Sequence, residues 1–301
     1  MDKGSRENIA GEKKLQLSTR VWTPSTLEEA WERKQQFGSN SCFVSGGTLL
    51  QVQQEQGGEY PPHLISLERV QELKGIYKKL DGSRPVLSIG ALTTIAVCRN
   101  DPFIMEKWMV LAEAARTIAA SAVRNRATIG GNVSNGFGDM IPVLLAVDAD
   151  GCWFDGKNFK IEKISKWLKR NTAKTEELLL TELLLPDPPI MNQSISFYKK
   201  VGCREVFTSS LVTISGYCGK NKAGEVEIVR LAVGGDETVP QRLTSCEKLL
   251  KGRMLTEEHL KKVYLKIVEE VQLTENIFAS EDYRKWTAAN AIFSELTKLI
   301  E

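Results

Sequence analysis

Strand-like and helix-like segments alternate along this chain. Short apolar runs at 42–44, 64–67 and 86–90 predict three strands, and the first of them leads directly into a pair of glycines. Before them, Ser25-Thr26-Leu27-Glu28 has the form of a capping box and predicts a short amphipathic helix that stops at Gly38. These elements predict a small α/β lobe at the start of the chain.

The middle of the chain predicts a second lobe. The alanine-rich segment 108–122 predicts one helix, and Pro142 opens a second, apolar helix at 143–147. Strand-like runs follow at 151–154 and 178–185. The sequence Pro186-Asp187-Pro188-Pro189 then breaks the pattern and predicts the clearest boundary in the chain.

The last part of the chain predicts three strands and two helices. Strand-like runs occur at 195–201, 211–218 and 225–233, and the apolar residues of 256–272 recur at helical spacing on one face. Ser280 caps a final helix. We therefore expect an α+β protein built of α/β lobes. Its expected parts are a flexible extension at 1–18, a first lobe at 19–75, a second lobe at 76–188 and a C-terminal domain at 189–301.

Composition narrows the possible functions. Hydrophobic residues make up 42% of the 301 residues and the net charge is +2, which is a globular composition with no sign of a nucleic-acid partner. The six cysteines include no Cys-x-x-Cys pair, so we expect no bound metal and interpret them as reduced, buried thiols of a cytoplasmic protein. Only His63 and His259 are histidines, which argues against a Ser-His-Asp triad. No apolar run is long enough to span a bilayer.

Two pairs of glycines are the candidates for ligand binding. The first lies in Phe43-Val44-Ser45-Gly46-Gly47-Thr48-Leu49-Leu50, and the second in Ala127-Thr128-Ile129-Gly130-Gly131-Asn132. Because glycine has no side chain, backbone N–H groups there can approach a phosphate closely, and the flanking hydroxyls add donors. Either loop alone is more often a tight turn. Two such loops that converge would cradle a pyrophosphate without needing a lysine.

Other phosphate-binding motifs fit less well. No G-x-G-x-x-G follows a strand, so a Rossmann site is not supported. Residues 151–157 nearly match a P-loop, but Asn158 stands where magnesium needs Ser or Thr, and Asp155-Gly156 is a better hairpin turn. Gly234-Gly235 is also interpreted as a turn.

The two glycine loops, in this order, resemble the FAD-binding (medium) subunit of molybdenum hydroxylases. That family includes the medium subunit of carbon monoxide dehydrogenase and the flavin portion of xanthine dehydrogenase. The stretch Arg124-Asn125-Arg126-Ala127-Thr128-Ile129-Gly130-Gly131-Asn132 is the most specific part of the resemblance. It is joined by Leu87–Thr94, by Val233-Gly234-Gly235 and by Asp282-Tyr283-Arg284, so it covers nearly the whole chain.

The resemblance implies a fold and a set of cofactor-binding residues. The fold would be the two-lobed FAD-binding fold of the vanillyl-alcohol-oxidase/PCMH type, followed by a C-terminal domain of the carbon monoxide dehydrogenase flavoprotein type. Lys199 would reach toward the flavin ring, although a solvated strand lysine is the alternative. The residues implied to bind FAD are Phe43, Val44, Ser45, Gly46, Gly47, Thr48, Leu49, Leu50, Ile118, Thr128, Ile129, Gly130, Gly131, Asn132, Asp139 and Lys199.

Two departures from the family pattern concern this site. Leu49 stands where the family has an aspartate after Gly-Gly-Thr. The stretch between Asn132 and Asp139 is about two residues short, with Gly136-Phe137-Gly138 in place of Ala-Ser-Pro. These departures bear on the register of Asp139 and on the surface over the flavin.

The resemblance also implies partners. The chain would carry non-covalent FAD, with the molybdenum cofactor in a large partner subunit and 2Fe-2S clusters in a small one. As in xanthine dehydrogenase, NAD would be the electron acceptor. The alternatives are a free-standing FAD oxidoreductase of the same fold, for which no acid or base residue stands out, and a non-catalytic assembly subunit that has lost FAD, which Leu49 and the shortened loop would favour.

Overall fold

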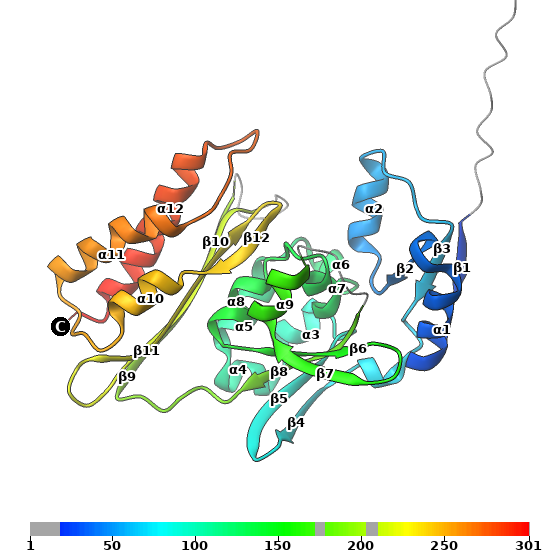
Figure 1. Cartoon of the computed structure of the whole chain (residues 1–301), viewed down its shortest axis with the longest axis horizontal. Helices are drawn as coiled ribbons and strands as arrows, with labels where there is room; N and C mark the ends of the chain where they lie inside the picture. Colours follow the sequence, from blue (N-terminus) through cyan, green and yellow to red (C-terminus); the bar gives the residue numbers. More distant parts are fainter. Residues whose placement is uncertain (1–18, 172–177, 203–209, 301) are drawn as a thin grey trace, which may run out of the picture.

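The computed structural model describes residues 19–171, 178–202 and 210–300. The extension expected at 1–18 lies outside these residues. The described chain forms three sheets with helices between and around them, in the order of the three expected lobes (Figure 1). None of the described helices combines the length and apolar character needed to span a membrane.

The first lobe is a parallel three-stranded sheet with strand order β1-β3-β2. Helix α1 covers it with Leu27, Ala30 and Trp31, which are all buried. The elements of this lobe are β1 (Arg20–Trp22), α1 (Leu27–Phe37), η1 (Gly38–Asn40), β2 (Ser41–Val44), α2 (Thr48–Glu55), β3 (His63–Ser66) and η2 (Gln71–Leu73).

The cap of α1 lies one residue later than the sequence indicates. Thr26, rather than Ser25, is the N-cap, and its hydroxyl accepts a hydrogen bond from Glu29 N at 3.2 Å. Glu29, rather than Glu28, closes the reciprocal contact by accepting from the backbone N–H of Ser25 at 2.8 Å. Because two hydroxyl residues and two glutamates are adjacent here, the sequence alone is compatible with either position of the cap.

The second lobe is an antiparallel five-stranded sheet with order β4-β5-β8-β6-β7, covered by a group of short helices. Its strands are β4 (Ile76–Asp81), β5 (Arg84–Gly90), β6 (Asp150–Phe154), β7 (Phe159–Lys163) and β8 (Leu179–Pro186). Its helices are α3 (Ile95–Asn100), α4 (Pro102–Lys107), α5 (Met109–Thr117), α6 (Ser121–Arg124), α7 (Ile129–Ser134), α8 (Ile141–Ala146) and α9 (Ile164–Asn171).

The single helix expected at 108–122 is broken. Helix α5 ends at Thr117, and Ala119 has a φ of 43°, which a non-glycine residue adopts at a cost of about 1–2 kcal/mol. Buried Arg124 holds this bend, because its guanidinium donates to the carbonyls of Ile118 and Ala119. The alanine content of 108–122 predicted a continuous helix. The break is instead stabilised by the guanidinium of Arg124, six residues after Ile118.

The third unit is an antiparallel four-stranded sheet with order β12-β11-β10-β9, and it lies between two layers of helices (Figure 1). Helices α10 and α12 pack on one face of it, while α5 and α8 of the second lobe pack on the other. All six residues of α8 are buried. The elements of this unit are β9 (Gln193–Gly202), β10 (Ser210–Lys220), β11 (Val226–Gly235), β12 (Thr238–Arg242), α10 (Thr244–Leu250), α11 (Glu257–Glu270) and α12 (Glu281–Thr297).

The cysteines of the described chain are all free thiols. Four of the five are buried, and burial raises the pKa of the Cys98 and Cys218 thiols to about 12. These two thiols therefore stay protonated at neutral pH and act as small apolar residues. Cys203 lies outside the described residues.

Buried Arg284 ties the start of α12 to the third sheet. Its guanidinium donates to the carbonyls of Leu211 and Gly235, each at 2.9 Å, and to the carbonyl of Thr274. The side chain is 1% exposed. A charge this deeply buried is tolerated because three carbonyl groups surround it.

We predict that Arg284→Met lowers the free energy of unfolding by about 3–5 kcal/mol, because three buried carbonyls lose their donor. Urea denaturation followed by circular dichroism measures the change. Arg253→Met, at an exposed position of the same unit, is the control and should change stability by less than about 0.5 kcal/mol. Equal midpoints for the two variants would contradict this assignment.

Candidate functional site

The first glycine loop connects strand β2 to helix α2. Val44 ends the strand, Gly47 is the N-cap of the helix, and its φ of 70° lies in the left-handed region that favours glycine. The chain thus turns sharply from the edge of the first sheet into a helix. This turn directs the start of α2 toward the second lobe.

The start of α2 carries a row of backbone donors without acceptors. Within the described chain, the N–H groups of Gly46, Gly47, Thr48, Leu49 and Leu50 donate to no backbone or side-chain group. The first groups of any helix lack intrahelical partners, and the helix dipole adds positive potential there. Five consecutive free donors therefore form a site suited to an anion.

The second glycine loop begins helix α7, and its own donors are largely used. Thr128 is the N-cap, and its hydroxyl accepts from Gly131 N at 3.1 Å. The N–H groups of Ile129 and Gly130 donate to the carbonyls of Thr93 and Ala91, each at 2.9 Å. This loop is therefore fastened to the second lobe and offers side chains, rather than free N–H groups, to a ligand.

The two loops touch backbone to backbone. A Cβ on Gly46 would lie 2.0 Å from the carbonyl oxygen of Arg126, and a Cβ on Gly131 would lie 2.9 Å from Ser45 Oγ. Only glycine permits this approach at Gly46, because the neighbouring atoms belong to the main chain. Contact between the loops therefore explains Gly46 and Gly131, whereas Gly47 adopts a left-handed φ and Gly130 packs against Ala91.

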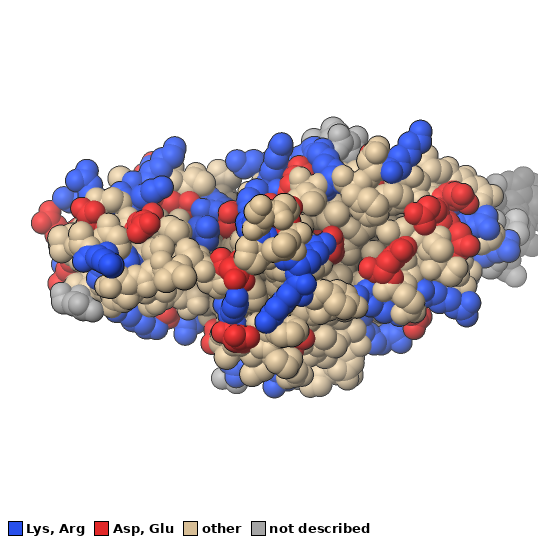
Figure 2. Space-filling view, turned by 90° about the horizontal axis from the view of Figure 1, so that it is seen from below, with Lys and Arg blue, Asp and Glu red and all other residues tan. Residues whose placement is uncertain are grey.

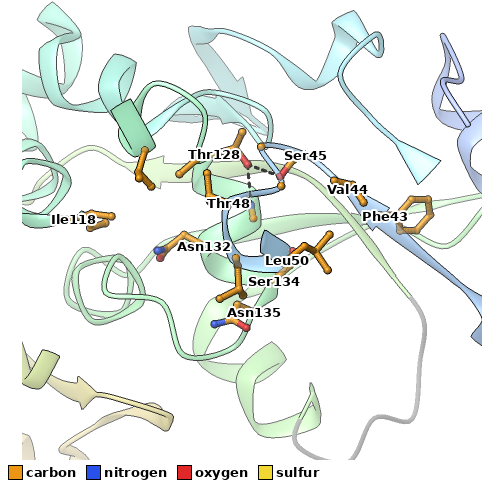
Figure 3. A pocket seen from close by; sticks show the side chains of 16 residues that line it. Phe43, Val44, Ser45, Thr48, Leu50, Ile118, Thr128, Asn132, Ser134 and Asn135 are labelled. Atoms are coloured by element: carbon orange, nitrogen blue, oxygen red, sulfur yellow. Dashed lines mark hydrogen bonds between the residues drawn. The ribbon is translucent and has the colours of Figure 1, made fainter. Parts of the chain in front are cut away.

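Hydrogen bonds through the hydroxyl groups of Thr128 and Ser45 join the loops and determine the direction in which the Thr128 proton is donated. Thr128 Oγ1 accepts from Gly131 N, so its own proton is free to go to Ser45 Oγ, 2.9 Å away (Figure 3). The Ser45 hydroxyl then donates to no described group, although it lines a cavity. It is positioned to donate its proton to a bound acceptor.

The two loops enclose a cavity of about 340 Å³ between the first and second lobes. Figure 3 shows Phe43 and Ile118 on opposite sides of it, with Asn132, Ser134 and Asn135 reaching in from α7 and the residue after it. Phe43 stacks on Trp31, with ring centroids 6.3 Å apart. Among the described residues that line the cavity none is ionisable, so their polar groups are neutral hydroxyls, amides and backbone N–H groups.

Asn132 is held by the shortened loop that follows it. Its Oδ1 accepts from Met140 N at 3.1 Å, and Gly138 packs so closely that a Cβ there would lie 2.0 Å from this oxygen. Because the oxygen is engaged, the amide Nδ2 is left as the available donor. The Gly136-Phe137-Gly138 departure thus forms a compact turn beneath Asn132.

Most of the residues expected to bind the cofactor converge on this cavity. Ile129 and Gly130 are buried behind it and hold the loop to the second lobe. Val123, Ala127, Ser134 and Asn135 also line the cavity but were not expected, although each lies within a few residues of the Thr128–Asn132 motif. The expected residues that line it are Phe43, Val44, Ser45, Gly46, Gly47, Thr48, Leu49, Leu50, Ile118, Thr128, Gly131 and Asn132.

Asp139 lies outside the cavity lining. Its Oδ1 accepts from Ser210 Oγ at 2.6 Å and from Thr213 Oγ1 at 3.0 Å, and its Oδ2 is 2.8 Å from Lys200 Nζ. The carboxylate is therefore engaged by the C-terminal domain, not directed at the cavity. Burial, together with the nearby carboxylate of Asp139, raises the pKa of Tyr198 far above its ordinary value.

Lys199 also lies away from the cavity. Side chains alternate along β9, and Tyr198 and Lys200 face the second lobe, where they contact Thr117. Lys199 therefore points to the opposite face, where its Nζ is 3.6 Å from Glu295 of α12 and its side chain is 56% exposed. This matches the alternative of a solvated strand lysine.

Comparison with known proteins identifies the fold and family. Residues 15–188 match the FAD binding domain in molybdopterin dehydrogenase, and residues 206–299 match the CO dehydrogenase flavoprotein C-terminal domain. The chain belongs to this family. The family model that covers 15–188 spans more than half of the chain, so the resemblance seen in the two glycine loops is confirmed.

Relatives in the family extend over most of the chain. The nicotinate dehydrogenase FAD-subunit of Eubacterium barkeri is 27% identical over 254 residues, which cover 79% of this chain and 81% of the relative. The carbon monoxide dehydrogenase medium chain of Hydrogenophaga pseudoflava is 38% identical over 128 residues, covering 42% and 43%. The solved carbon monoxide dehydrogenase of H. pseudoflava superposes with a TM-score of 0.82 at 22% identity, covering 93% and 96%. This superposition confirms the expected fold.

The cavity suits the family's cofactor on its own geometry. A pyrophosphate needs several converging donors, and the five free N–H groups of the first loop and the Ser45 hydroxyl supply them. The apolar side chains of Ile118 and Val123 offer a surface for a flat ring. The residues present therefore fit FAD.

We predict that Gly46→Ala lowers the free energy of unfolding by about 3 kcal/mol, because the new Cβ would overlap the Arg126 carbonyl and separate the loops. Gly252→Ala is the control, since its φ of 72° adds strain of about 1–2 kcal/mol but no atom lies within 4 Å. Denaturation of both flavin-free variants measures the difference. A Gly46→Ala variant no less stable than Gly252→Ala would refute the close contact.

Proposed function

We propose that this chain is the subunit that holds non-covalent FAD in a molybdenum hydroxylase of the xanthine dehydrogenase type. Its partners are a large subunit with the molybdenum cofactor and a small subunit with 2Fe-2S clusters, and its electron acceptor is NAD. Family membership supports the FAD-binding role. The relatives named as FAD-subunits and medium chains support the partnership, because such names describe one component of a larger enzyme.

The observation that carries the FAD assignment is the row of free N–H groups at the start of α2. Unpaired backbone donors facing a cavity leave hydrogen-bonding capacity unused, and a ligand with several acceptor oxygens satisfies it. The part of the cavity wall that the structure describes carries no lysine or arginine. Charge on the pyrophosphate is then stabilised by dipoles and hydrogen bonds alone, as helix N-termini allow.

Each loop has a separate part in holding the cofactor. The first loop binds the pyrophosphate through its backbone and the Ser45 hydroxyl. The second loop presents the Asn132 amide, whose orientation is fixed by Met140 N. Ile118, at the bend held by Arg124, packs against the adenine side. The chain thereby positions the cofactor and keeps it from exchanging.

The cavity offers no residue for acid–base chemistry of its own. When bound, FAD supplies the redox chemistry, taking up electrons and passing them to the acceptor. Because the lining contributed by residues 19–171, 178–202 and 210–300 contains no ionisable side chain, we expect no proton transfer from these residues at the cavity. This favours a role in electron transfer between partners over that of a free-standing oxidoreductase.

One observation favours the alternative of an assembly subunit without FAD. Leu49 puts an apolar, 42% exposed side chain in the cavity wall, where the resemblance led us to expect an aspartate. Its backbone N–H nevertheless remains a free donor, so Leu49 removes one side-chain contact and preserves the anion site. Flavin content of the purified chain separates this alternative from the proposal.

The deciding experiment is the visible absorption spectrum of the chain, purified with its partners, before and after NADH is added without oxygen. A flavin spectrum that bleaches supports both the FAD site and the NAD acceptor. Bound flavin that does not bleach removes NAD from the proposal. Absence of flavin even after reconstitution with FAD would refute the FAD assignment. Activity assays with xanthine test the substrate separately.

We predict that Ser45→Ala weakens FAD binding about tenfold or more, since a hydrogen bond to a charged group contributes about 1.5–3 kcal/mol. Reconstitution of the flavin-free chain, followed by flavin fluorescence, measures the dissociation constant. Ser83→Ala, at an exposed turn between β4 and β5, is the matched control and should leave it unchanged. Equal affinities for the two variants would show that the Ser45 hydroxyl does not contact the cofactor.

A further inference from the structure

A second cavity, of about 220 Å³, lies between the second lobe and the C-terminal domain. It shares no lining residue with the cavity between the glycine loops. One wall is the proline-rich connector between β8 and β9, and the other walls come from the start of β5, the end of α4, the stretch after α8, and strands β9–β11. Figure 2 shows Lys and Arg side chains, with Asp and Glu among them, over the middle of the molecule.

Arg230 of β11 is the unusual residue of this cavity. Its side chain is 20% exposed, yet within the described chain its guanidinium forms no hydrogen bond. The nearest carboxylate oxygen, Asp148 Oδ2, is 3.9 Å from Nη2, which is too far for one. Burial lowers the pKa of Arg230 from its ordinary value, and the guanidinium lies over the Tyr217 ring, 6.0 Å from its centroid, with no hydrogen-bonded carboxylate among the described residues.

The other charged groups of this cavity already have close partners. Arg84 Nη2 is 2.7 Å from Asp81 and 2.8 Å from Asp150, and Lys107 Nζ is 2.6 Å from Asp187. Asp148, which faces Arg230, is 3.1 Å from Lys163 and 3.9 Å from Arg242. Among the described groups of the cavity, Arg230 is therefore the cation left available for a ligand.

The walls beside Arg230 are flat and apolar. The indole N–H of Trp108 donates to the carbonyl of Pro186, and the hydroxyl of Tyr217 donates to the carbonyl of Pro189. With their polar ends occupied by the connector, both rings contribute apolar surface. The connector adds the rings of Pro188 and Pro189.

We propose that this interdomain cavity binds a small aromatic monocarboxylate, with Arg230 holding the carboxylate group. A guanidinium matches a carboxylate with two parallel hydrogen bonds, and the aromatic and proline walls suit a flat apolar body. A dianion such as phosphate fits less well, because Asp148 and Asp187 line the same cavity and a single cation is available. The site is independent of the FAD assignment, because it shares none of its residues.

Benzoate is the probe, titrated calorimetrically into the full chain. We expect saturable binding to the wild-type chain, at least tenfold weaker binding to Arg230→Gln, and unchanged binding to the control Arg253→Gln. Neutral benzamide, which has nearly the same shape, should bind at least tenfold more weakly than benzoate, and so should inorganic phosphate. Absence of benzoate binding at about 10 mM, where even a weak site would respond, or equal affinity of Arg230→Gln and the wild type, overturns the proposal.

A second measurement tests, in the absence of a ligand, whether Arg230 contributes to the stability of the chain. Because the Arg230 guanidinium is partly buried and its Asp148 partner is 3.9 Å away, Arg230→Met should raise the thermal midpoint of the free chain, since an apolar side chain there removes a desolvation penalty that the long ion pair does not offset. The same variant should abolish the rise in midpoint that benzoate gives the wild-type chain. A lower midpoint for Arg230→Met would show that Arg230 already serves a structural partner and would overturn the proposal.

Discussion

One backbone contact brings the two lobes of the flavin domain together at the cavity. Gly46 and the carbonyl of Arg126 approach so closely that no side chain fits between them, although eighty residues separate them in the chain. The hydrogen bonds from Gly131 through Thr128 to Ser45 lie beside this contact and hold its geometry. The cavity exists because the loops meet at this point and diverge on either side of it.

The C-terminal domain also stabilises the cavity between the glycine loops, through a residue that lies outside the cavity lining. Asp139 follows the short turn beneath Asn132 and is held by Lys200, Ser210 and Thr213 of the third sheet. Because Met140 N fixes the Asn132 amide, the position of a cavity residue depends on contacts made by another domain. Asp139, which was expected to contact the cofactor, instead anchors the turn beneath a residue that lines the cavity.

Sequence reasoning predicted the central strands of the described sheets, helices α11 and α12 and both glycine loops, since periodicity and glycine pairs are local signals, but it missed the edge strands β1, β4, β7 and β12. It missed what depends on distant partners. The break at Ile118 needs the Arg124 guanidinium, and the role of Asp139 needs the third sheet. For Lys199, the sequence shows that side chains alternate along the strand. It does not show which face of β9 packs against the second lobe. The free donors of α2 and the uncommitted Arg230 emerge only when every hydrogen bond is located.

Helix α8 has a consequence for how this chain can be divided or recombined. All six of its residues are buried, because one side packs in the second lobe and the other against β10 and β11. Separating the chain at the proline-rich connector would expose the buried apolar residues of α8 to solvent. An exposed apolar surface of this kind promotes aggregation. The residues matched by the two family models therefore share one buried helix as common core, so we expect neither part to stay soluble without the other.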